Sequence, residues 1–372
     1  MSARATRTPP ETRSRRSARR EPRDIVTGTD PSPSGIDDVV PRDPPSQQAK
    51  ARTRLYLSGV LAQEDFPVED ISQHLEKDDA VIWVDLCAPG ADELSLVAHE
   101  LGLHRLAVAD ATDLRQRPKL DRYASHEFLN MYAVQLDHAT AELKLSELAA
   151  FITPSALITV RKDSAFDMEQ VVARWDDMPD LAGFGVGFLL YGLIDHIVDG
   201  HFEAVQDLDE EIEELEDLLF DQQTGDEELQ RRSFALRKSL VTLRRVVLPM
   251  REVVNSLMRR DLEAVTDEMT PYYQDVYDHV LRATEWTEWL RDLVTTILET
   301  NLTLQGNRLN VITKKVTSWA AIIAVPTAIT GWYGQNLPYP GFASTSGLIG
   351  SVVLIASISI GLFVTFKRKD WL

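Results

Sequence analysis

The hydrophobic pattern of the first half of the chain alternates between two kinds of short segment. Stretches of β-branched and aromatic residues between turn signals predict strands at residues 55–61, 80–86, 128–136, 145–152 and 156–161. The stretches between them have the composition of short helices at residues 67–77, 91–101 and 103–112. This alternation predicts an α/β domain over residues 52–180.

A helical pattern replaces the strands from Phe184 onward. In residues 202–221 the apolar side chains form one stripe and acidic residues occupy the other faces. A second helix, at about 227–260, is rich in arginine, so antiparallel pairing across Gly225 is expected within a helical hairpin of residues 181–268. Pro249 predicts a kink or a break in the second helix.

One long helix is predicted over residues 269–333. Pro271 is a favoured first-turn residue, and only Gly306 and Pro326 weaken the helical pattern before Tyr333. About 60 helical residues at 1.5 Å each would span roughly 90 Å. Such a helix would connect an intracellular domain directly to a membrane.

The strongest apolar signal lies near the C-terminus, where the 51 residues 316–366 contain no charge. Two apolar stretches, 316–333 and 347–366, each have the length that crosses about 30 Å of hydrocarbon. The polar stretch 334–346 between them contains prolines and glycine and is predicted to be a loop. A buried helix pair of a soluble protein is the alternative, but the second stretch lacks a polar stripe, which favours a two-helix transmembrane hairpin.

The positive residues predict the orientation of this hairpin. Lys314 and Lys315 precede the first stretch, the basic end 367–372 follows the second, and the loop has no lysine or arginine. Because positive residues stay on the cytoplasmic side, both chain ends are expected in the cytoplasm and the loop outside the cytoplasmic membrane.

Charge is distributed unevenly along the chain. The whole chain has 39 Lys+Arg against 58 Asp+Glu, a net charge of −19; residues 1–54 hold 12 basic and 7 acidic residues (+5), which leaves −24 on residues 55–372. The strongly acidic composition of residues 55–372 argues against nucleic-acid binding, which needs a basic face. It is compatible with the handling of cations, or with solubility alone.

The remaining composition narrows the possible chemistry. A single cysteine, Cys87, excludes an intrachain disulfide and a cysteine-based zinc site. The His99/His104 and His196/His201 pairs are five residues apart and do not share a helix face, which argues against a histidine metal site. The basic, Pro- and Ser-rich segment 1–51 is predicted to be a disordered tail, either solvated or in contact with anionic lipid. No nucleophile–base pair or phosphate loop stands out, so an enzyme is not predicted.

Several motifs resemble the CorA family of magnesium and cobalt transport proteins. These are Tyr333-Gly334-Gln335-Asn336 at the end of the first apolar stretch, Gln116-Arg117-Pro118-Lys119, the segment 273–279, the segment 307–310 and the basic C-terminus. The similarity extends over about residues 52–372. The resemblance implies a homopentamer whose first spans line a pore for Mg2+, with Gly334, Gln335 and Asn336 as the selectivity filter.

Neutral oxygens suit such a filter, because Mg2+ gives up its water reluctantly and can be held through that water. Small and polar residues also recur along the predicted helix at pore-lining or close-packing spacing: Asn310, Thr313, Thr317, Ala320, Ala324, Thr327, Gly331 and Gly334. The resemblance further implies a regulatory Mg2+ between subunits, bound by Asp110 and Asp275. Either aspartate is alternatively a plain surface residue.

The chain departs from the family pattern at two places. Gln335 replaces the methionine of the family signature, and the loop after it has no acidic residue. Mg2+ is therefore the expected ion, with Co2+, Ni2+ or Zn2+ left open. The competing hypotheses are a Zn2+ transporter on the same scaffold and a membrane-anchored scaffold that transports nothing.

Overall fold

The computed structural model describes residues 51–113, 116–220, 226–259, 265–335, 338, 341–342 and 344–372. All of them belong to one compact unit, residues 47–372. The predicted tail before residue 51, Gly225 and the filter residue Asn336 lie outside the described residues.

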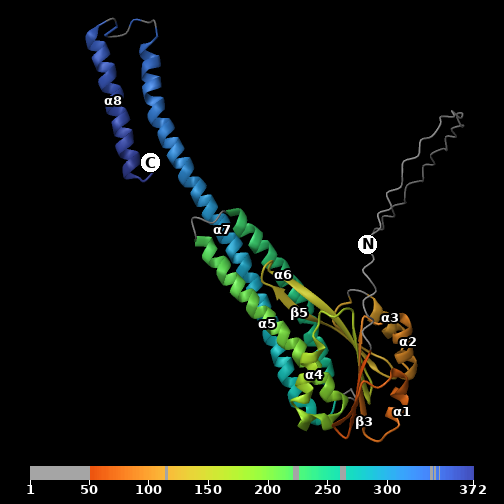
Figure 1. Ribbon diagram of the computed structural model, residues 1–372. Coiled ribbons are helices and arrows are strands. Elements are labelled where there is room, and N and C mark those ends of the chain that lie inside the picture. The colour runs from red at the N-terminus through yellow and green to blue at the C-terminus, as the bar shows by residue number, and fades with distance from the viewer. Residues whose placement is uncertain are drawn as a thin grey trace, which may run out of the picture. The chain divides into compact units, whose positions relative to one another are not determined.

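The α/β part contains a sheet of seven strands in the order β2-β1-β3-β7-β6-β5-β4 (Figure 1). The strands are β1 (Arg52–Leu57), β2 (Val60–Glu64), β3 (Ala80–Cys87), β4 (Lys119–Arg122), β5 (Glu127–Asp137), β6 (Glu142–Ile152) and β7 (Ala156–Arg161). Only the central pair β3–β7 is parallel; the other neighbours are antiparallel. Four of the five predicted strands are confirmed as β3, β5, β6 and β7.

The predicted strand 55–61 is wrong as a single element. It covers the end of β1, a tight turn at Ser58 and Gly59, and the start of β2. Both turn residues have positive φ, 50° and 79°, and a Cβ on Gly59 would lie 2.7 Å from the backbone nitrogen of Gly183. The fourth strand, β4, was not predicted because Lys-Leu-Asp-Arg has no alternating apolar pattern.

Helices cover both faces of the sheet. Alternation along β3 sends Ile82, Val84 and Leu86 into the core on one side and Trp83 into the core on the other. The first core is closed by α1 (Ile71–Leu75), α2 (Ala91–Glu100) and α3 (Arg105–Thr112), in the positions where short helices were predicted. The second is closed by α4 (Met168–Asp176) and the long helices; α4 was not predicted (Figure 1).

The long helices α5 (Val186–Phe220), α6 (Asp226–Leu257) and α7 (Thr270–Tyr333) pack side by side (Figure 1). Arg232 of α6 pairs with Glu214 of α5 at 3.4 Å, in keeping with the predicted acid–base pairing. Of the kink or break predicted at Pro249, the break is wrong, because α6 continues through this residue, and the kink stays a prediction. Val247 and Met250 are buried on either side of the proline in the same core, so packing holds both halves in one helix.

The last helix, α8 (Thr345–Arg368), lies against the C-terminal part of α7 (Figure 1). Among the described residues it is the one helix that is long and apolar enough to cross a membrane, and none of its residues is buried. The C-terminal part of α7 is less apolar, since threonines, Gly331 and Pro326 interrupt its aliphatic residues. Residues 345–366 of α8 carry no charge, and a helix of this kind with no buried side chain is unsuited to water, which sets α8 apart from the core helices.

Candidate functional site

The predicted small and polar stripe of α7 is not covered by any other described element of the chain. The seven stripe residues that lie within α7 are all exposed: Asn310, Thr313, Thr317, Ala320, Ala324, Thr327 and Gly331. Ser318 is buried, and Ala321, Ile322, Val325 and Ile329 are half-buried. At 100° per residue these five centre about 130° around the helix from the stripe, and α8 is the element that packs along this part of α7. One face of α7 is thus occupied by α8, while the stripe faces away from it.

Two threonines of this segment direct their hydroxyl hydrogens into the helix. Thr327 Oγ1 donates to the carbonyl of Ile323 at 3.1 Å, and Thr330 Oγ1 donates to that of Pro326 at 2.9 Å. Each oxygen therefore keeps its lone pairs for an outside donor. Pro326 has no N–H, so the carbonyl of Ile322 also lacks its usual helical partner. This part of α7 presents neutral acceptor oxygens without any fixed charge.

Two of the three predicted filter residues are described, directly after α7. Gly334 has φ −79° and ψ −5°, and its N–H donates to the Thr330 carbonyl at 2.8 Å. Gln335 N–H donates to the Trp332 carbonyl at 3.3 Å, and both residues are exposed. The dihedral angles of Gly334 are open to any residue, and a Cβ at this position would approach the Thr330 carbonyl oxygen to 3.1 Å, a tight contact.

The predicted regulatory residues Asp110 and Asp275 are not brought together within one chain. Asp110 lies on α3, which closes the core on one face of the sheet, whereas Asp275 lies on α7 with the helices of the other face. Asp110 is already engaged, since Lys119 Nζ lies 2.6 Å from its Oδ2 and 2.6 Å from Asp121 Oδ2. A cation shared by the two predicted residues would need a second copy of the chain.

The structure instead gathers Asp275 with residues that the sequence did not single out. Ligand atoms of Asp195, Asp199 and His279 lie within 4.8 Å of one another, and Asp275 lines the same cavity of about 600 Å3. Asp195 and Asp199 are four residues apart on α5, as are Asp275 and His279 on α7, so each pair shares a helix face. The i, i+4 spacing of these acidic residues and of the acid–histidine pair, rather than a His–His pair, is the sequence signal of this cluster.

The electrostatics of this acidic cluster leave room for a cation. Arg174 contacts Asp195 and lies 2.7 Å from Asp199. Burial raises the pKa of Asp195, and the neighbouring Asp199 carboxylate raises it further, so the two negative charges still repel. His279 Nδ1 is buried without a hydrogen-bond partner among the described residues. The carboxylate oxygens are suitable ligands for Mg2+. The imidazole nitrogen is a ligand that transition metals prefer, so the same cluster can also bind one of these.

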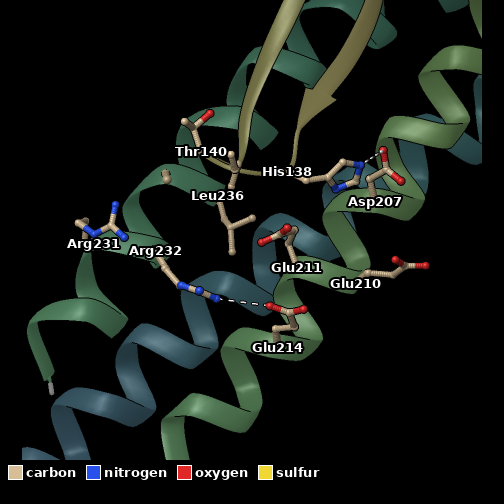
Figure 2. Close-up of a pocket in the computed structure, with 12 residues that line it drawn as sticks. His138, Thr140, Asp207, Glu210, Glu211, Glu214, Arg231, Arg232 and Leu236 are labelled. Atoms are coloured by element: carbon tan, nitrogen blue, oxygen red, sulfur yellow. Dashed lines mark hydrogen bonds and ion pairs between the residues drawn. The ribbon is translucent and has the colours of Figure 1, made fainter. Parts of the chain in front are cut away.

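A second acidic hollow of about 400 Å3 lies between α5, α6 and the β5–β6 turn, as Figure 2 shows. Two of its carboxylates face basic partners: His138 Nε2 lies 3.7 Å from Asp207, and Arg232 lies 3.4 Å from Glu214. These exposed pairs connect the three elements and neutralise part of the charge. The hollow is a weaker candidate for binding a cation than the cluster around Asp195.

The sequence comparisons identify the family. The family profile described as "CorA-like Mg2+ transporter protein" matches residues 78–368. The chain belongs to this family. It is a CorA-family transporter of divalent cations, and membrane location follows from the family and from α8.

Individual relatives agree with this assignment. The chain is 28% identical to the cobalt/magnesium transport protein CorA of Thermotoga maritima over 294 residues, which cover 78% of this chain and 83% of that protein. Its fold matches the complete structure of the CorA magnesium transporter from Methanocaldococcus jannaschii, with a TM-score of 0.71, 24% identity and coverage of 87% of this chain and 98% of the other. The zinc transport protein ZntB of Yersinia pseudotuberculosis is 22% identical over 258 residues, covering 69% of this chain and 77% of the relative.

Proposed function

We propose that the chain forms a homopentameric Mg2+ channel in the cytoplasmic membrane, with α7 as the pore-lining span and α8 as the second span. The observation that carries this proposal is the exposed stripe of α7, which faces away from α8. Within the span the stripe consists of Thr317, Ala320, Ala324, Thr327 and Gly331, whose small side chains let helices approach a common axis and whose hydroxyl oxygens suit contact with water. Five such helices around an axis would enclose a narrow wet path lined by neutral oxygens.

The filter of this channel is Gly334-Gln335-Asn336 at the outer end of α7. A ring of carbonyl and amide oxygens without fixed charge holds hydrated Mg2+ through its water and releases it again. The glutamine adds a second amide to that ring where the family signature has methionine. Both chain ends lie on the cytoplasmic side, because basic residues flank the two spans there.

Closure of the channel depends on intracellular Mg2+. Asp275 belongs to the acidic cluster with Asp195, Asp199 and His279, and Asp110 of a neighbouring subunit is the proposed partner across the interface. Bound Mg2+ screens these carboxylates and holds the subunits together. When the internal Mg2+ concentration falls, repulsion between the carboxylates favours the open state.

Ion flux into proteoliposomes tests the proposal. Mg2+, Co2+ and Zn2+ are compared at several internal Mg2+ concentrations, with wild type and Asn336→Ala. We expect wild-type Mg2+ entry that internal Mg2+ suppresses, and loss of entry in Asn336→Ala. No flux of any of the ions would instead support a non-transporting scaffold.

The second candidate is Zn2+ transport, favoured by the similarity to ZntB and by the imidazole in the acidic cluster. Against proton-coupled transport, the stretch 316–366 contains no Asp, Glu, His, Lys or Arg to relay a proton. Zn2+ entry that exceeds Mg2+ entry at equal concentration would decide for this candidate.

A further inference from the structure

A third cavity, of about 460 Å3, lies where α6 packs on the edge of the sheet. It is adjacent to the Gln116-Arg117-Pro118-Lys119 motif, to which the transport function assigns no role. Its walls come from the segment before β4, from β5 and β6, from the end of β7 and from α6. The lining residues are Gln116, Arg117, Pro118, Tyr132, Leu145, Glu147, Lys162, Asp163, Thr242, Arg245 and Val246.

Three of the lining charges are engaged within the chain. Lys162 Nζ donates to the carbonyl oxygens of Ala111 and Asp113 at 2.6 and 2.5 Å. Asp163 accepts the backbone N–H of Ala165 at 2.9 Å. Glu147 accepts the backbone N–H of Gln116 at 3.2 Å.

The two arginines of the cavity differ from their neighbours. Neither the Arg117 nor the Arg245 guanidinium forms a hydrogen bond or ion pair with the part of the chain that the structure describes, and both are exposed. The adjacent Arg244 pairs with Glu288 at 3.0 Å, and Arg161 pairs with Asp85 at 2.5 Å. Two arginines that pair with neither Glu147 nor Asp163, the carboxylates of the same hollow, are unexpected on a part of the chain (residues 55–372) with a net charge of −24.

The floor of the cavity is apolar. Pro118 and Val246 are buried beneath it, Tyr132 presents its ring with only 9% exposure, and Leu145 remains 40% exposed. A volume of this size is typical of sites for small organic ligands. The combination suits a molecule with an anionic end and a flat or apolar body.

We propose that this cavity binds a soluble nucleotide-sized phosphate ester, with Arg117 and Arg245 on the phosphate and the apolar floor under the body of the ligand. Two guanidinium groups offer more donors than one carboxylate can accept, whereas a phosphate group has several oxygens for them. The arginine side chain is also the one best suited to bidentate phosphate contacts.

The position of the cavity argues for a soluble ligand rather than a lipid headgroup. The Arg244–Glu288 pair places this part of α6 at the level of Glu288 on α7. The uncharged stretch begins only at Val316, roughly 40 Å further along the helix at 1.5 Å per residue. A headgroup in the bilayer would not reach the cavity.

Calorimetric titration of the full-length protein in neutral detergent tests the proposal. ADP is the probe, EDTA keeps divalent cations out of the measurement, and inorganic phosphate and adenosine are the comparison ligands. We expect ADP to bind more tightly than either fragment. Arg117→Ala and Arg245→Ala should each weaken ADP binding roughly tenfold, since a hydrogen bond between charged groups is worth about that factor. The milder Arg117→Lys and Arg245→Lys should fall between wild type and alanine.

Arg237→Ala is the matched control, because Arg237 is an exposed arginine of the same helix that does not line the cavity. It should leave ADP binding unchanged.

Equal weakening in this control, no ADP binding, or phosphate binding as tight as ADP binding would overturn the proposal. So would competition by anionic lipid in nanodiscs, which points to a headgroup. Unchanged ADP binding in the arginine variants would also overturn it, because ADP would then bind elsewhere; altered subunit assembly in the same variants would show that a neighbouring subunit contacts the two arginines. Since the titration contains no transported ion, its failure is separate from failure of the proposed channel.

Discussion

Lys119 Nζ donates to Asp110 at 2.6 Å and so occupies the carboxylate that was predicted to hold a regulatory cation. Burial lowers the pKa of Lys119, but its hydrogen bonds to Asp110 and Asp121 more than offset this and raise it. The ammonium therefore stays charged at neutral pH, and a metal ion at Asp110 has to compete with it.

Removing this competitor should strengthen regulation by Mg2+. In Lys119→Met, Asp110 becomes available, and we expect half-maximal closure at an internal Mg2+ concentration lower by roughly fivefold to tenfold, the worth of a charge-assisted hydrogen bond. Proteoliposome flux at graded internal Mg2+ measures the shift. Arg105→Ala, on the helix α3 that also carries Asp110, serves as a control for the loss of one positive charge. An unchanged midpoint in Lys119→Met would show that Asp110 takes no part in regulation.

The acidic cluster should bind cations with a ligand-dependent preference. Asp195→Asn removes an oxygen donor and should reduce the thermal stabilisation that Mg2+ and Co2+ both give to the full-length protein. His279→Ala removes the nitrogen donor and should weaken the Co2+ effect more than the Mg2+ effect. Glu210→Gln in the hollow of Figure 2 is the control and should change neither. Equal loss of both metals in His279→Ala would argue against imidazole ligation.

His201 should make the stability of the protein depend on pH. It is fully buried, Nε2–H donates to the Tyr132 carbonyl at 2.7 Å, and burial lowers its pKa from 6.5 to about 4. A lowered base pKa means that the stabilisation is complete above pH 6.5 and is lost as the pH falls through 4. The loss should reach about 3 kcal/mol, from 1.36 kcal/mol per pKa unit. Thermal unfolding of wild type and His201→Gln between pH 7 and pH 4 measures it; equal pH dependence of the two would exclude this residue as the cause.

Gly192 and Gly200 of α5 should respond in opposite ways to alanine. A Cβ on Gly192 would lie 2.5 Å from Trp175 Nε1, and that buried indole also donates to the Leu189 carbonyl at 3.1 Å. Gly192→Ala should therefore destabilise the protein by about 1–3 kcal/mol through overpacking. Gly200→Ala meets only an ordinary contact at 3.7 Å and should be neutral or gain up to about 1 kcal/mol of helix propensity. Denaturant unfolding compares them, and equal effects would contradict the packing described here.

Periodicity was sufficient to predict the elements in which one pattern repeats several times. The strand at 156–161, the helix ending at Tyr333 and the uncharged stretch that became α8 are of this kind. Periodicity does not predict short or polar elements. β4 has four residues and no alternation, and the Ser58-Gly59 turn was absorbed into an apolar run.

The candidate sites depended more on tertiary structure. The hydrogen bond between Lys119 and Asp110 requires β4 to lie beside α3. A polar strand of four residues has no sequence pattern that predicts this position. The acidic cluster joins an Asp pair on α5 to Asp275 and His279 of α7, about 80 residues later. Each pair alone is a common surface pattern, and only the packing of α5 on α7 gives them a shared cavity.

The proposed pore depends on the orientation of α7, which Mg2+ flux through variants with a bulky residue at one of two neighbouring positions can test. Ala324→Phe places a ring on the small and polar stripe, whereas Ile323→Phe places one on the adjacent exposed apolar face. In proteoliposomes with equal amounts of assembled protein, we predict that Ala324→Phe abolishes Mg2+ entry and Ile323→Phe retains most of it. Equal flux in the two variants, or loss only in Ile323→Phe, would contradict a pore lined by this stripe.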